Sequence, residues 1–125
     1  MAKPQSVTVS APIDTSATKT IVLCHGQSGE YLLKTLTFVP SEATTANASN
    51  KYVIAFTQGG TTIGTSLDSN TAAFEADTPQ AVTLTQSAGA SLEFGATDVL
   101  KIVATLTGSK DMAGTFVAAF EQVRV

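Results

Sequence analysis

The chain has 125 residues, with seven basic residues, ten acidic residues, one histidine and one cysteine. This length fits one domain, and a single cysteine excludes an internal disulfide. The formal net charge is −3 and the basic residues are scattered singly, which excludes the basic surface needed to bind nucleic acid or an anionic membrane. We therefore expect neither a nucleic-acid partner nor a membrane partner. The amino terminus also lacks the apolar segment of a signal peptide.

Residues 1–19 are predicted to form an extended or disordered amino-terminal arm, as a loose tail or as a single edge-like strand. Prolines remove backbone donors and favour extended backbone here, and larger apolar side chains are few. Such a segment could add a strand to another sheet. The candidate partner-contact residues are Lys3, Pro4, Val7, Val9, Pro12 and Ile13. Residues 20–125 contain the rest of the alternating pattern, so they are predicted to form one domain that folds without the arm.

Strand signals recur at short spacing from residue 20 onward, with a polar surface loop at 41–50. The clearest local prediction is a hairpin turn at Gly59 and Gly60, because two central glycines tolerate the positive φ angles that a two-residue turn requires. A tight turn places Phe56 opposite Ile63, with the apolar residues of 52–56 on the same face. It also places Thr57 and its partner on the opposite face. One face is therefore predicted to be buried and the other to be a row of threonines.

Later segments continue the period-two pattern. A helix over 98–106, capped by Asp98, is the main alternative there, but β-branched residues and alternation favour a strand over 99–107. The final strand, 115–125, is predicted to be covered on both faces or to contain a bulge near Ala118 and Ala119. About eight short strands with no convincing helix predict an all-β antiparallel sandwich.

Cys24 and His25 are the most reactive side chains in the sequence. Neighbours in a strand point to opposite faces, so the two side chains should diverge rather than act as nucleophile and base. One histidine cannot supply a zinc-ligand spacing or a two-histidine metal set. We interpret the pair as a buried thiol beside a histidine at the end of a strand.

The acidic residues give no stronger signal. Glu75 and Asp77 would share a face in an extended chain, but we interpret them as a solvated strand end. The 68–70 segment resembles part of a calcium loop yet lacks its glycine and terminal glutamate, so it is predicted to be a turn. Asp98 is predicted to form an Asx turn or a cap where a strand begins. We expect no catalytic residue, no metal and no cofactor, and therefore no enzyme.

The stretch from Gly29 to the end resembles small jelly-roll-like structural proteins of tailed bacteriophages, including capsid decoration (cement) proteins. The resemblance rests on YLLKTLTFVP at 31–40, the polar loop, KYVIAF at 51–56 with its Gly-Gly hairpin, ATDVLKI at 96–102 and a final strand. It implies a jelly-roll-like sandwich that lacks catalytic residues. The Ala- and Thr-rich arm of such proteins is matched by residues 1–19, whereas Cys24 and His25 have no counterpart in the pattern.

This resemblance leads us to expect a non-enzymatic virion protein, made in the host cytoplasm and located on the capsid surface. It would bind the major capsid protein. Three-fold axes are frequent docking points in this group, so a homotrimer is expected. The alternative is a β-sandwich recognition module of a head fibre, spike or adhesin, which binds glycans or a host surface. Saturable sugar binding distinguishes the alternative from capsid decoration.

Overall fold

The computed structural model describes residues 5–71, 73–85 and 92–124, all of them in strands, turns and loops without a helix. Six strands are five or more residues long, and four are two-residue strands. The long strands are β1 (Ser6–Thr15), β2 (Lys19–Leu23), β3 (Glu30–Pro40), β4 (Lys51–Gln58), β9 (Leu100–Thr107) and β10 (Met112–Arg124). The short strands are β5 (Thr61–Thr62), β6 (Leu67–Asp68), β7 (Gln80–Ala81) and β8 (Glu93–Phe94).

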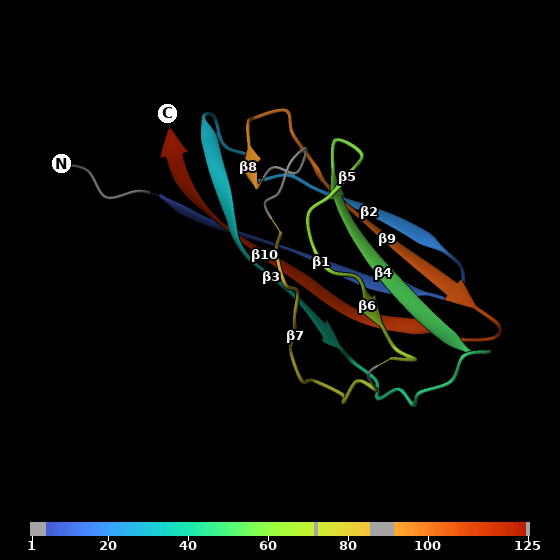
Figure 1. Cartoon of the computed structure of the whole chain (residues 1–125). Helices are drawn as coiled ribbons and strands as arrows, with labels where there is room; N and C mark the ends of the chain where they lie inside the picture. The colour runs from blue at the N-terminus through green and yellow to red at the C-terminus, as the bar shows by residue number, and fades with distance from the viewer. Residues whose placement is uncertain (1–4, 72, 86–91, 125) are drawn as a thin grey trace.

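These strands form two antiparallel sheets that face each other (Figure 1). One sheet has the order β1-β10-β3-β7, with β8 also paired to β3, and the other has the order β2-β9-β4-β5, with β6 also paired to β4. β7 and β8 both pair with β3, and β5 and β6 both pair with β4. Each sheet therefore has four strand positions, one of which is shared by two short strands. The first strand pairs with the last, and the second with the last but one. This arrangement confirms the predicted jelly-roll-like sandwich of about eight strands.

The core lies between the sheets and follows the predicted alternation. In β4, β9 and β10, buried residues occupy every second position, and the aromatic rings of the two sheets interlock. The Phe38 and Phe116 rings lie 4.8 Å apart, and Phe116 also contacts Phe56 edge-on at 6.4 Å. Residues 100–107 form β9, so the helical alternative is wrong and the strand prediction is confirmed.

The Gly59–Gly60 hairpin has the predicted register. Thr57 lies opposite Thr62, and the Ile63 N–H donates to the Phe56 carbonyl at 3.1 Å. The φ angles of Gly59 and Gly60 are 60° and 85°, the left-handed values that the turn requires. Phe56 and Ile63 are fully buried, so both the turn and the parity are confirmed.

The last strand differs from its predicted form. A register shift does occur beside Ala119, but the extra residue belongs to the neighbouring strand, because Ala119 lies opposite Thr35 and Phe120 lies opposite Leu33. Lys34 is therefore the unmatched residue of a bulge in β3, and both Lys34 and Thr35 are exposed. The bulge lets both halves of β3 bury apolar residues although their parities differ.

The amino-terminal segment is an integral part of the sandwich, which corrects the predicted division at residue 19. Along its ten residues β1 pairs with β10, without a register shift. Ile13 is only 3% exposed, and Val7, Val9 and Ala11 pack against the core. The segment is extended, as predicted, but it completes a sheet of its own domain.

Candidate interaction surface

The structure places the predicted contact residues on different surfaces. Val7 and Val9 face the core and are half-buried, and Ile13 is buried, so these side chains serve the sandwich itself. Pro12 is exposed on the outer face of the sheet. Lys3 and Pro4 lie outside the described residues. Of the predicted set within the described residues, Pro12 is the one exposed side chain, and Val7 and Val9 keep part of their surface accessible.

The outer face of the β1-β10-β3 sheet presents small side chains in three cross-strand rows, which we call the outer grid. The rows are Thr8–Ala119–Thr35, Ser10–Val117–Thr37 and Pro12–Thr115–Val39. All nine residues are exposed or half-buried, and their chain neighbours face the core except Lys34 at the bulge. The 20 threonines of the sequence indicate hydroxyl-rich outer faces. The pairing of distant strands is needed to show which of these residues lie side by side.

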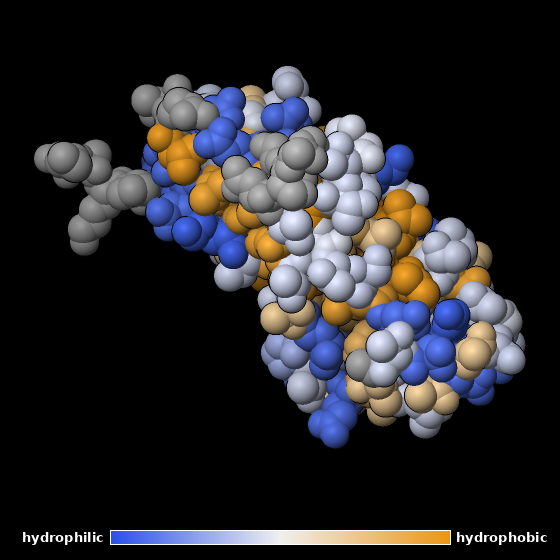
Figure 2. Space-filling view, viewed as in Figure 1, coloured by the Kyte–Doolittle hydropathy of each residue, from blue (hydrophilic) through white to orange (hydrophobic). Residues whose placement is uncertain are grey.

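The outer grid contains no charged residue. On these strands, the nearest charged positions facing the same way are Asp14, Lys34 and Glu121, at the ends or at the bulge. The outer face of the other sheet instead carries Lys101 and a Lys51–Asp68 ion pair with a 3.8 Å separation. On the side viewed in Figure 2, apolar and intermediate side chains are mixed along the length of the molecule, and hydrophilic side chains are most numerous towards its two ends.

Strand β1 has one free edge. The Gln122 N–H donates to the Gln5 carbonyl at 2.8 Å, so this pair is a hydrogen-bonded pair of the β1–β10 ladder. Such pairs alternate in an antiparallel ladder, so the odd residues of β1 bond to β10 and the even residues point their backbone groups away. Pro12 occupies one of these outward positions, where its missing N–H removes no ladder bond. Within the described residues, β10 is the one strand that pairs with β1.

The predicted burial of the Cys24 thiol is wrong, and His25 is the buried member of the pair. Cys24 is exposed, and His25 is 3% exposed. The His25 Nε2–H donates to the Phe94 carbonyl at 2.8 Å, and Nδ1 accepts from the Gln27 N–H at 3.1 Å. The ring also stacks at 4.5 Å from Tyr31. His25 thus joins the turn after β2 to β8, and both ring nitrogens are engaged in structural bonds.

Replacing His25 by leucine is expected to lower the free energy of unfolding by about 1–3 kcal/mol, because the buried Phe94 carbonyl loses its donor and the Gln27 N–H loses its acceptor. Urea denaturation monitored by circular dichroism measures the change. Cys24→Ser is the matched control on the adjacent, exposed side chain, with an expected change within about 0.5 kcal/mol. A larger loss for Cys24→Ser than for His25→Leu would contradict this assignment.

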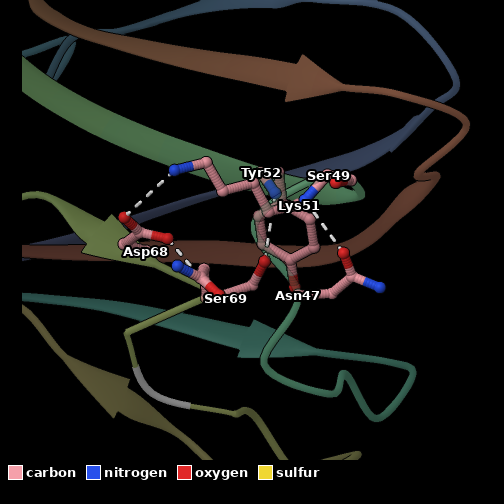
Figure 3. Close-up of polar contacts among 7 residues, drawn as sticks. Asn47, Ser49, Lys51, Tyr52, Asp68 and Ser69 are labelled. Carbon is pink, nitrogen blue, oxygen red and sulfur yellow. Dashed lines mark hydrogen bonds and ion pairs between the residues drawn. The ribbon is translucent and has the colours of Figure 1, made fainter.

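A polar cluster stabilises one end of the sandwich (Figure 3). The Ser69 hydroxyl accepts from the Tyr52 N–H at 3.0 Å, while the Ser69 N–H donates to the Tyr52 carbonyl. The Asn47 side chain accepts from the Ser49 N–H at 2.9 Å. In the same cluster, Asp68 accepts from the Asn70 N–H at 2.8 Å, which confirms the predicted turn over residues 68–70.

The pKa values of two residues in this cluster, Asp68 and Tyr52, are shifted in directions that suit a structural role. The Asn70 N–H, with a smaller contribution from Lys51, lowers the pKa of the Asp68 carboxyl. Burial, with Glu42 nearby, raises the pKa of Tyr52 to about 12, so the phenol remains protonated at neutral pH. Both shifts favour the protonation states that these groups already have at neutral pH, and neither prepares a group for proton transfer.

The remaining acidic candidates do not assemble into a site. Glu75 and Asp77 are exposed in the loop before β7, and Asp98 accepts from the Gly95 N–H at 2.8 Å, as the predicted cap. Among the described residues, no three His, Cys, Asp or Glu side chains are grouped so that they could hold a metal ion. The same residues include no helix that is long and apolar enough to cross a membrane.

Comparison with known proteins gives no family: no family model, curated protein or solved structure matches the chain. Among the surfaces of the described residues, the outer grid and the β1 edge are the best defined.

Proposed function

We propose that this protein is a non-enzymatic virion structural protein that decorates a bacteriophage capsid by binding coat subunits through the outer grid. The observation that carries the proposal is the charge-free, three-row arrangement of small side chains across β1, β10 and β3. The jelly-roll order of the strands and the resemblance to phage decoration proteins support the same assignment.

The chemistry of the outer grid suits a protein partner. The cores of protein interfaces are depleted of charged residues, since each buried charge must be desolvated. Threonine and serine hydroxyls can form hydrogen bonds to a facing backbone, while Val39 and Val117 supply apolar contact. Short side chains also lose little conformational entropy when a partner orders them.

A matched pair of substitutions tests this proposal. Val117→Lys introduces a charge at the centre of the outer grid, and Val103→Lys introduces the same charge on the outer face of the other sheet. The binding partners to test are capsids of phage coat proteins, beginning with any coat protein whose gene is found beside the gene of this chain. Val117→Lys is expected to weaken co-sedimentation at least about tenfold, because an unpaired charge is buried on binding. Val103→Lys should bind as the original protein does.

The outcomes are distinguishable. Both variants should keep the circular dichroism spectrum of the original protein, since both side chains lie on outer faces. Equal capsid binding by Val117→Lys and the original protein would overturn the assignment of the outer grid. Failure of the original protein to bind capsids, together with saturable binding to a glycan array, would instead favour the recognition-module alternative.

A further inference from the structure

We propose that the free edge of β1 pairs antiparallel with the β1 edge of a second copy of this chain, around a two-fold axis at Thr8. The proposal concerns the edge of the sheet and does not rest on capsid binding by its outer face. It follows from which edges the sandwich leaves open and from the residues that alternate along β1.

The side of the sandwich opposite β1 is closed by contacts between its two sheets. Gly64 forms a β-bridge with Leu84, the Thr65 N–H donates to the Thr83 carbonyl at 2.9 Å, and the Thr85 N–H donates to the Ile63 carbonyl at 2.8 Å. The strands on that side are two residues long. On the open side, β2 has five residues and β1 has ten. The edge of β1 is therefore the longest unpaired edge of the described sandwich.

Protective features are scarce along this edge. Natural edge strands avoid association through lysines, bulges, prolines or covering segments. The β1–β10 register is unbroken, and the outward residues Ser6, Thr8 and Ser10 are small and uncharged. Among the described residues of β1, the protective features are Pro12 and the charged Asp14, and both lie near the carboxyl end of the strand. Residues 6–10 thus present a continuous series of backbone donors and acceptors.

Pro12 also selects the register of a self-pair. The residues that can bond to a second copy are the even-numbered ones, whose backbone N–H and C=O groups point away from β10. Even-numbered residues of one copy must therefore lie opposite even-numbered residues of the other. Centring the two-fold axis on Thr8 pairs Ser6 with Ser10 of the second copy and Thr8 with itself. Every donor in these pairs is present. Centring the axis on Ser10 would instead place Pro12 opposite Thr8 and lose a bond from each copy.

The side chains match themselves in this register. On the outer face, the hydroxyls of Ser6, Thr8 and Ser10 face hydroxyls, and such cross-strand pairs stabilise sheets. On the inner face, Val7 lies opposite Val9 of the second copy in a non-hydrogen-bonded pair, where side chains approach closely. Both valines are half-buried in the single chain, so pairing would remove further apolar surface from water. This self-matching identifies a second copy as the partner.

A proline substitution separates edge pairing from side-chain contact. Thr8→Pro removes an outward N–H, as Pro12 already does, so the β1–β10 ladder keeps its bonds. Thr8→Ala is the control that retains the N–H. Light scattering of the full chain is expected to give twice the 12.8 kDa chain mass for the original protein and for Thr8→Ala. Thr8→Pro should lose the dimer while keeping its circular dichroism spectrum.

Cross-linking tests the register even if Thr8→Pro fails to fold. In a Cys24→Ser background, the two Thr8→Cys residues should lie about 5.5 Å apart between Cα atoms, within disulfide range. The two Ser10→Cys residues would be displaced by four positions, about 13 Å along the strands. Mild oxidation should therefore link Thr8→Cys and leave Ser10→Cys unlinked.

Several results would overturn the proposal. A monomer at all concentrations, or the homotrimer that the resemblance implies, would contradict the two-fold pairing. A folded Thr8→Pro variant that remains dimeric would show that another surface holds the copies together. Equal cross-linking at positions 8 and 10 would contradict the register centred on Thr8.

Discussion

Deletion of residues 1–15 is expected to abolish the cooperative unfolding transition. The deletion removes β1, with buried Ile13 and the half-buried Val7 and Val9, each a side chain whose full burial contributes about 1.5–3 kcal/mol. The two half-buried valines contribute about half of that value each. Together with the lost β1–β10 hydrogen bonds, the loss is comparable with the lower end of the stability of a small domain, about 5–15 kcal/mol. It also leaves the long strand β10 as an unpaired edge, which favours aggregation.

Urea denaturation and light scattering measure both consequences of this deletion. Deletion of residues 1–4 is the control, because it leaves β1 complete, and it should keep the cooperative transition. If the protein without residues 1–15 remained monomeric and unfolded cooperatively near the original midpoint, β1 would be the separable arm that the sequence pattern predicted.

The features that could be predicted from the sequence are local. The Gly59–Gly60 turn fixes the pairing of its two flanking segments, so the alternation of residues 52–56 sufficed to assign the buried face. A strand over residues 99–107 could be predicted because β-branched residues occur there with period two, and β9 occupies 100–107. In both places, the residues that determine the structure lie within about ten positions of one another, as turn and strand propensities require.

The features that could not be predicted depend on residues far apart in the chain. Nothing in residues 6–15 indicates that they pair with residues of β10 that lie 97 to 115 positions further along the chain. The bulge at Lys34 becomes visible only when β3 is aligned with β10. Likewise, His25 is buried because Phe94 and Phe120 come to it from distant segments. The outer grid combines β1, β10 and β3, so its threonines could be counted from the sequence but not assembled into a surface.

The second large effect is expected at Phe56. Its side chain is fully buried, and its ring lies edge-on to Phe116 of the opposite sheet at 6.4 Å. Phe56→Ala should therefore lower the free energy of unfolding by about 3–5 kcal/mol, through lost burial and an unfilled cavity. Thr57→Ala is the matched control, since Thr57 faces outward opposite Thr62, where a cross-strand pair contributes about 0.2–1 kcal/mol.

Urea denaturation of the two variants tests the parity of β4 directly. Phe56→Leu keeps most of the apolar volume, so it should cost less than Phe56→Ala and provide a measurable transition if the alanine variant does not fold. An unchanged m-value would show that the denatured states remain comparable, and the shift in midpoint would then report stability alone. Equal losses for Phe56→Ala and Thr57→Ala would mean that the buried face of β4 is wrongly assigned. A loss confined to Phe56 would instead support a core shared by both sheets, because Phe116 can meet Phe56 only across the space between them.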